Sequence, residues 1–225
     1  MEELTRLKLI IDGRLKSDHP GLSVLLSTIS GVTVKSLDES LEAFKGEVLK
    51  KIRTQYKLES LKDEPVFRAY RDFFWNIGVD PTKIRPAAEA LVRRALLGKP
   101  IPTINTLVDA YNLASMETGI ALAAFDRSKI SGDLIMRYAR PGESFQGIGM
   151  TSPIILRGIE VVISDGEKLV AIYPYRDADS SKIVESTKSL ILLACGVPGI
   201  DEDILKKARD TATSYIERFC GGEAL

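Results

Sequence analysis

Carboxylates are the acid and base groups that this chain offers for chemistry. Its 225 residues include two cysteines and one histidine, His19, which lies at a His-Pro-Gly turn. The sequence contains no phosphate-binding glycine loop, zinc-ligand spacing or G-x-S-x-G elbow. A Ser-His-Asp mechanism would depend on His19, and a single histidine at a turn is typical of a surface residue. Acid–base chemistry by Asp or Glu is therefore the chemistry to look for.

Glu160 is the candidate catalytic carboxylate. It stands in RGIEVVISD, directly before an apolar run that is typical of a buried strand. Loss of water around a carboxylate on such a strand would raise its pKa and suit it to acid–base catalysis. The alternative is a strand residue that faces outward, and the sequence leaves both open.

Three polar side chains share one face of the helix expected in INTLVDAYNLASMETG. Asn105, Asp109 and Asn112 are spaced i, i+4 and i+7 among apolar residues. Buried amides and carboxylates need hydrogen-bond partners. They either tie the helix to a neighbouring loop by bonding its backbone or form the polar wall of a substrate pocket.

Positive charge is concentrated between residues 83 and 99. The basic residues of this stretch are Lys83, Arg85, Arg93, Arg94 and Lys99. Against them stands one acid, Glu89, so the local charge is 5 − 1 = +4, whereas the whole chain balances 31 basic and 31 acidic residues. Together with Arg137, Lys83 and these arginines are a candidate site for a polyanion such as RNA. The alternative is pairing with acids, for example Glu89 with Arg93 one helical turn away.

Hydrophobic spacing predicts the elements that position these residues. Helices are expected near 38–57, 66–77, 86–97 and 203–219, with further helical patterns over 104–119 and 181–197. Pro86 suits the first turn of its helix and Gly98 a left-handed C-cap. Residues 6–12 read as a strand, and residues 22–34 as two short strands or as a strand and a helical turn.

Between about 132 and 175 the pattern changes to short β-type runs. Turn signals at Gly132-Asp133, Pro141-Gly142 and Asp165-Gly166 separate four or more expected antiparallel strands, and the last of these turns joins a hairpin. Helices, then a β-rich part, then helices predict an α+β fold.

Composition narrows the class of protein. A chain of 225 residues with 44 % apolar residues fits one domain spanning 1–225. No stretch approaches the ~20 apolar residues of a membrane span, and the acidic start MEELTRLKLIIDGR is no signal peptide, so we expect a cytoplasmic protein without a membrane partner. Cys195 and Cys220 are expected to be buried free thiols rather than a disulfide. No cofactor or metal is indicated.

Several of these motifs, in this order, resemble one known family. The segment G-x-DPTK-x-RP-x-x-EAL-x-RR-x-L-x-GK is followed by P-x-IN-x-LVDAYN, GIALAAFD, SGDLIMRYARPGESF, RGIEVVISD and YRDADSSKI, over roughly residues 65–190. The chain resembles stand-alone relatives of the tRNA-editing domain of the phenylalanyl-tRNA synthetase beta subunit, the B three-four domain. The resemblance implies a three-layer fold of helices and β-sheets.

The resemblance also implies an activity and a pocket. The synthetase domain hydrolyses tyrosine mistakenly attached to the phenylalanine tRNA by positioning a water on the ester. The resemblance places Ala123 and Phe125, in LAAFD, at the editing pocket. Ala123 stands where the family usually has a histidine. Without that histidine, backbone N–H groups near Gly147 and Gly149 would stabilise the oxyanion and Glu160 would orient the water.

We therefore expect a protein that binds tRNA or aminoacyl-tRNA. Hydrolysis of a mischarged aminoacyl ester in trans is the catalytic form of this hypothesis. The alternatives are a non-catalytic module that binds RNA or an amino acid, and an adaptor that binds another protein. The missing histidine favours a binding module, and the clustered arginines favour a polyanion over a protein partner. The sequence does not indicate an oligomeric state.

Overall fold

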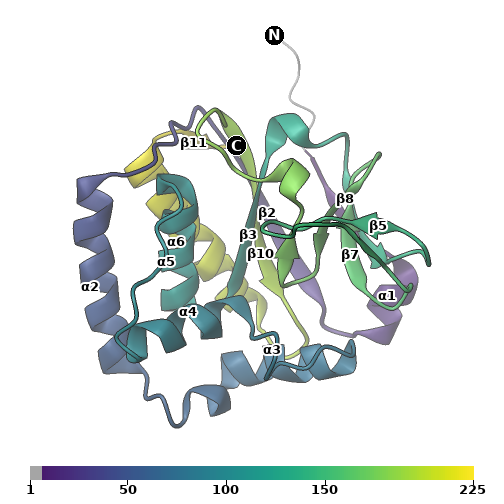
Figure 1. Ribbon diagram of the computed structural model, residues 1–225, viewed down its shortest axis with the longest axis horizontal. Coiled ribbons are helices and arrows are strands. Elements are labelled where there is room, and N and C mark those ends of the chain that lie inside the picture. Colours follow the sequence, from purple (N-terminus) through teal and green to yellow (C-terminus); the bar gives the residue numbers. More distant parts are fainter. Residues whose placement is uncertain (1–6) are drawn as a thin grey trace.

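Five of the six α-helices in residues 7–225 form within a residue or two of the ranges that the hydrophobic spacing predicts, and the short helix over residues 13–18 was not predicted. The computed structural model describes residues 7–225 (Figure 1). Its helices are α1 (Gly13–Asp18), α2 (Glu39–Gln55), α3 (Pro65–Asn76), α4 (Ala87–Leu96), α5 (Thr106–Thr118) and α6 (Glu202–Cys220). The Asp38 carboxylate begins α2 by accepting N–H groups of Ser40 and Leu41. Gly119, in the left-handed conformation at φ 75°, ends α5.

Eleven strands form three sheets in the described residues. The strands are β1 (Leu9–Ile11), β2 (Ser23–Ser30), β3 (Ala121–Asp126), β4 (Leu134–Tyr138), β5 (Ser144–Phe145), β6 (Ile154–Ile155), β7 (Val161–Ser164), β8 (Leu169–Ile172), β9 (Arg176–Asp177), β10 (Ser189–Gly196) and β11 (Glu223–Ala224). One sheet has the order β1-β4-β7-β8-β9, a second β11-β2-β10-β3, and β5 pairs with β6. The predicted hairpin at Asp165-Gly166 joins β7 to β8 and is confirmed.

The elements stack in three layers and confirm the predicted α+β fold. In Figure 1, α2, α4, α5 and α6 lie on one side of the four-stranded sheet, and the five-stranded sheet lies on the other. Helix α6 contacts β10 and β2, and α5 contacts β3. The four-stranded sheet is therefore the central layer, which explains why β10 is buried along almost its whole length. No helix in residues 7–225 is long and apolar enough to cross a membrane.

The predicted helix over 181–197 is wrong. Residues 189–196 form β10, which lies between β2 and β3 and pairs antiparallel with both. A continuous apolar run fits a buried strand and a buried helix equally well, so its hydrophobic periodicity did not distinguish them.

The N-terminal expectations are corrected in part. Residues 22–34 contain one strand, β2, which ends before Gly31 at φ 79°. The predicted strand over 6–12 is found as β1, and Arg6 lies outside the described residues, as do the other residues of 1–6 in the segment assessed for a signal peptide. Cys195 and Cys220 are buried free thiols, as predicted.

Tyr70 of α3 joins the helical layer to the central sheet. Its buried hydroxyl donates to the carbonyl of Cys195 and accepts the N–H of Ala121 at 3.1 Å. Ala121 and Cys195 face each other where β3 and β10 pair. Both backbone groups are buried, so water could not take the place of the Tyr70 hydroxyl as their hydrogen-bond partner.

Replacing Tyr70 with phenylalanine is expected to lower the free energy of unfolding by about 2–4 kcal/mol, because it leaves a buried donor and a buried acceptor unpaired. Urea denaturation measures the loss. Tyr56→Phe is the matched control, since the buried Tyr56 bonds no backbone group through its hydroxyl among the described residues, and it should cost less than about 1 kcal/mol. Equal losses in the two variants would contradict this role for Tyr70.

Candidate functional site

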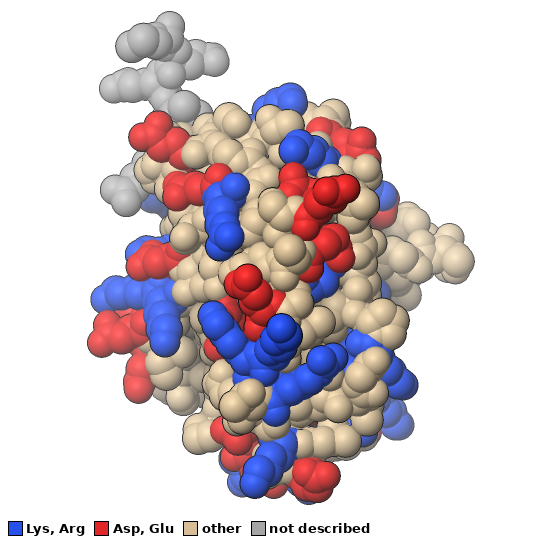
Figure 2. Space-filling view, turned by 90° about the vertical axis from the view of Figure 1, so that its left-hand side faces the viewer, with Lys and Arg blue, Asp and Glu red and all other residues tan. Residues whose placement is uncertain are grey.

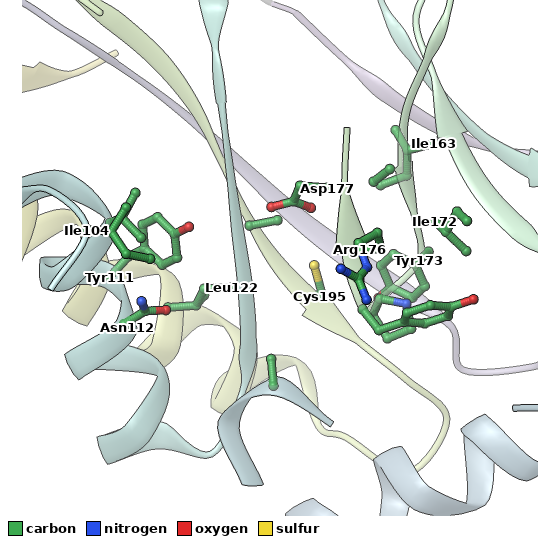
Figure 3. A pocket seen from close by; sticks show the side chains of 16 residues that line it. Ile104, Tyr111, Asn112, Leu122, Ile163, Ile172, Tyr173, Arg176, Asp177 and Cys195 are labelled. Carbon is green, nitrogen blue, oxygen red and sulfur yellow. The ribbon is translucent and has the colours of Figure 1, made fainter. Parts of the chain in front are cut away.

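A pocket of about 230 Å³ opens where the three layers meet along the edge strand β3 (Figure 3). Its lining comes from α4, α5, β3, β7, β8, β9, β10 and the turn between β8 and β9. The residues are Ala87, Ile104, Val108, Tyr111, Asn112, Leu122, Ala123, Ile163, Ala171, Ile172, Tyr173, Pro174, Tyr175, Arg176, Asp177 and Cys195. We call it the central pocket. Its volume lies below the roughly 300–1,000 Å³ of pockets for drug-sized ligands, so it suits a small group such as an amino-acid side chain.

Asp177 is the one carboxylate among these lining residues. It lies on the edge strand β9, and Figure 3 draws its side chain between Tyr111 of α5 and Cys195 of β10. Burial raises the pKa of Asp177 to about 7, against the opposing effect of the positive charge of Arg176. Burial and the charge of Asp177 also raise the pKa of Tyr111. A perturbed carboxyl group in a pocket is a common mark of a functional site.

The three polar residues predicted on one helix face have separate positions. Asn105 is the N-cap of α5 and accepts the N–H of Val108 at 3.0 Å. Asp109 accepts the N–H of Ile104 at 3.0 Å and lies 3.6 Å from the buried Lys45 ammonium. Asp109 thus bonds the backbone of the loop before α5, and Asn105 caps the helix itself, so both have structural roles rather than forming a pocket wall. Of the three, Asn112 lines the central pocket.

Of the site residues that the resemblance implies, some line the central pocket and others do not. Ala123 lines the central pocket, whereas Phe125, two residues along β3, is fully buried. The N–H of Gly147 faces the Met150 sulfur at 3.1 Å, and Gly149 is exposed at φ 77°. Neither glycine is among the lining residues, so their predicted role at an oxyanion stays a prediction.

The expectation of a raised pKa at Glu160 is wrong. Burial acts to raise it, but backbone N–H groups outweigh burial and hold the pKa of Glu160 below its usual value. The carboxylate accepts the N–H groups of Arg157, Gly158 and Ile159 at 3.0–3.2 Å. Glu160 is not a lining residue of the central pocket, and its bonds hold the loop that leads into β7.

The acid of the basic segment, Glu89, is buried in a pairing that the sequence did not predict. It accepts two hydrogen bonds from Arg71 of α3, at 2.9 and 3.1 Å, and lies 3.2 Å from Arg85. The expected pair of Glu89 with Arg93 is not formed. The Arg71–Glu89 pair joins α3 to α4. Because Glu89 is 3 % exposed, the charge of Arg85 is likewise matched by a buried carboxylate. Lys83 is exposed, at 4.0 Å from Asp80.

A wider basic surface forms where α2 approaches α4. The guanidinium of Arg53, on α2, donates to the carbonyl of Ala95, on α4, at 3.1 Å. We define the basic surface as Lys50, Arg53, Arg93 and Arg94; none of the four forms an ion pair with a carboxylate of residues 7–225. Figure 2 looks onto the side of the molecule that carries α2, and Lys and Arg side chains gather in its lower part while acidic ones are more frequent above.

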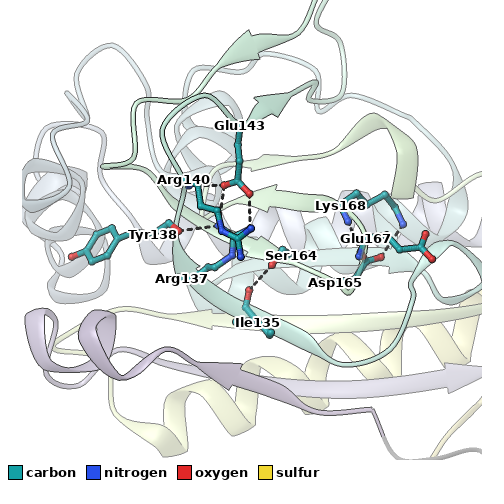
Figure 4. A network of polar contacts seen from close by, with 9 residues as sticks. All are labelled: Ile135, Arg137, Tyr138, Arg140, Glu143, Ser164, Asp165, Glu167 and Lys168. Atoms are coloured by element: carbon teal, nitrogen blue, oxygen red, sulfur yellow. Dashed lines mark hydrogen bonds and ion pairs between the residues drawn. The ribbon is translucent and has the colours of Figure 1, made fainter.

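Arg137 does not belong to this surface. It lies on β4 of the five-stranded sheet and donates two hydrogen bonds to Glu143, at 2.7 and 2.9 Å (Figure 4). The pair lines a groove of about 540 Å³ in which Lys168 likewise contacts Asp165 at 2.8 Å. Since its charge is matched by Glu143, Arg137 is a poorer candidate for a polyanion than Arg93 or Arg94.

The polar residues of the central pocket that sequence reasoning missed include Tyr111, Arg176 and Asp177. Tyr111 adjoins Asn112 in LVDAYN, and the other two stand in YRDADSSKI, so both motifs contained the signal without showing which side chains point inward. No group of His, Cys, Asp and Glu in residues 7–225 is arranged to hold a metal ion.

Comparison with known proteins extends over most of the chain. A model of the B3/4 domain matches residues 69–221. The phenylalanine–tRNA ligase beta subunit of Nocardia farcinica is 32 % identical over 117 residues, 52 % of this chain and 14 % of that protein. The beta subunit of Geobacter metallireducens is 30 % identical over 163 residues, 62 % of this chain and 20 % of that protein. This chain thus spans about a fifth or less of the length of these relatives.

A solved structure has the same fold. An N-terminal fragment of the phenylalanyl-tRNA synthetase beta subunit from Pyrococcus horikoshii superposes with a TM-score of 0.53 and 12 % identity, over 98 % of this chain and 50 % of that one. The predicted fold is thereby confirmed. With the match over residues 69–221, the chain belongs to the B3/4 domain family.

Proposed function

We propose that this protein binds aminoacyl-tRNA in trans, with the aminoacyl group in the central pocket. The observation that carries the proposal is the pocket itself, which is of a size for one amino-acid side chain and lies beside Ala123, in the motif where family members have their editing pocket. Its apolar walls, formed by residues such as Leu122, Ile163 and Ile172, suit an uncharged side chain. Asn112 and Asp177 supply polar groups that would fix the ligand's orientation.

The basic surface supports the RNA part of the proposal. Arg93 and Arg94 lie on α4, whose first residue, Ala87, lines the central pocket. One short helix thus connects the pocket with unpaired positive charge. RNA bound along this helix would have its phosphates near the arginines while its 3′ end reached the pocket.

The proposal predicts tighter binding of aminoacylated than of uncharged tRNA. A panel of tRNAs ending in 3′-amino-3′-deoxyadenosine, each carrying a stable amide-linked amino acid, is compared with the uncharged forms by filter binding. At least one member should bind about tenfold more tightly than its uncharged form. In Ala123→Leu, whose larger side chain would fill the pocket, that difference should disappear while binding of uncharged tRNA is unchanged. Equal binding of all charged and uncharged tRNAs would refute the proposal.

Hydrolysis of the ester is the second candidate function, and the family's editing pocket favours it. Natural ester-linked tRNAs from the same panel, incubated with the protein, decide between a binder and an enzyme. Glu160→Ala tests the catalytic role predicted for Glu160, because loss of a positioning group typically costs on the order of 10²–10³ in rate. Turnover that survives this change would assign the catalysis to residues other than Glu160.

A further inference from the structure

The carboxylate of Asp177 has no protein partner in the central pocket. No side chain and no backbone N–H of residues 7–225 donates a hydrogen bond to it, and no ion pair includes it. Its neighbour Arg176 donates instead to the carbonyl of Ile148 at 3.3 Å. The backbone carbonyl of Asp177 accepts the N–H of Ile148 at 2.9 Å. The carboxylate is therefore left without a hydrogen-bonded or ion-paired partner among residues 7–225.

The groups packed against Asp177 do not supply a counter-charge. Tyr111 approaches from α5 and Cys195 from β10, and burial keeps both neutral by raising their pKa values. Arg176, on the same strand, is the one cation that acts on Asp177. Asp177 is half-buried, and a carboxylate that loses part of its water without gaining a partner is destabilised in its charged form. Such a group either takes up a proton or binds a cationic ligand.

We propose that Asp177 binds the ammonium group of the ligand, so that the pocket accepts aminoacyl groups with a free amine and rejects those whose amine is acylated. This inference rests on the proposed function, since it assigns a role within the same pocket. An ammonium supplies the three donors and the positive charge that the site lacks. A carboxylate or phosphate ligand would be repelled, because its negative charge would lie beside that of Asp177.

The ammonium could be the α-amine of any amino acid or the side-chain amine of a lysine-like one. The walls formed by Leu122, Ile163 and Ile172 leave room for an aliphatic chain in either orientation. The two sources are separated by acetylating one amine at a time.

The test uses small probes and does not need tRNA. The probes are 3′-deoxy-3′-(aminoacylamino)adenosines carrying alanine, leucine or lysine, each with its α-amine free or acetylated, and the lysine probe also with only its side-chain amine acetylated. Affinity is measured by calorimetry, and the titration of Asp177 is followed by NMR of its ¹³C-labelled carboxyl group. Asp177→Asn is the matched variant, because it keeps the shape of the side chain and removes its charge.

Acetylating the amine that Asp177 binds should weaken binding about tenfold to a hundredfold. The free-amine probe should lower the pKa of the Asp177 carboxyl, and the acetylated probe should not. In Asp177→Asn the free and the acetylated probes should bind alike. Loss on α-acetylation assigns the α-ammonium, and loss on side-chain acetylation alone assigns the lysine-like source.

The inference is overturned if acetylation changes neither affinity nor the Asp177 titration, or if no free-amine probe binds. Failure of the proposed function is separate, because it shows as equal binding of charged and uncharged tRNA, whatever the small probes do.

Discussion

Reversing the charge of Arg93 and Arg94 together is expected to weaken tRNA binding on the order of a hundredfold at 50 mM salt. Each arginine that contacts a phosphate releases counterions on binding, so removing two contacts should also lower the salt dependence of log Kd by about 2. Both side chains are half-buried and neither forms an ion pair with a carboxylate among residues 7–225. The change removes the two hydrogen bonds that Arg94 donates to the exposed Pro100 carbonyl, which water can replace, so the fold should survive. Filter binding of one tRNA between 50 and 200 mM salt measures both effects.

The matched control is Lys206→Glu with Lys207→Glu. These are also two consecutive basic residues on a helix, but they lie exposed on α6, outside the basic surface. The control variant should bind tRNA within about threefold of the original protein. If both double variants lose affinity equally, the attraction comes from overall charge and not from α4. A melting temperature close to that of the original protein excludes unfolding as the cause of the loss.

Asp177→Asn is expected to stabilise the protein above pH 7 and not near pH 4. The pKa of Asp177 is raised in the fold from 3.8 to about 7, so the folded protein holds the proton that the unfolded chain releases between those values. Stability is therefore lost as pH rises from about 4 to about 7, and the loss is complete above 7. Asparagine bears no charge, so the variant avoids this loss and should gain on the order of 2 kcal/mol at pH 8.

Urea denaturation of both proteins at pH 4.5, 6, 7 and 8 checks this expectation. The control is Asp179→Asn, two residues away, whose carboxylate is paired with Lys182 at 2.7 Å on the surface. It should change stability little and without the same rise from pH 4.5 to 8. A gain for Asp177→Asn that is equal at every pH would mean that ionisation of Asp177 is not its cause.

Most of the helices could be predicted because their signals are local. An N-cap such as Asp38, a C-terminal glycine such as Gly119 and an apolar face repeating every three or four residues all act within one turn of the chain. The sequence was a poorer guide to which side of each helix is buried. On α4 the buried residues include Ala88, Glu89 and Val92, because Arg71 and Arg85 neutralise a carboxylate that the sequence alone marks as exposed.

The candidate site could be predicted only in outline, because it depends on contacts between distant segments. The motifs indicated Asn112 and Ala123, whose helix and strand follow each other in the chain. Asp177 was missed because its significance arises from Tyr111 and Cys195, which the fold brings to it from elements before and after it. Glu160 was misjudged for a similar reason. Its strand is buried as expected, but the loop before it turns three N–H groups onto the carboxylate.

The position of β10 between β2 and β3 has a consequence for synthesis on the ribosome. Ser23 of β2 pairs with Gly196 and Ser30 with Ser189 of β10. The first strand of the central sheet can therefore pair with β10 only after residues near the end of the chain have been synthesised. The interval from residue 30 to residue 196 is 166 residues, which takes about 8–33 s at roughly 5–20 residues per second. Throughout that time the apolar run SVLLSTIS lacks the strand that covers it, and an unpaired strand of this kind is prone to associate with other chains. The nascent chain therefore passes through an interval of several seconds or more in which β2 is exposed to association with other chains.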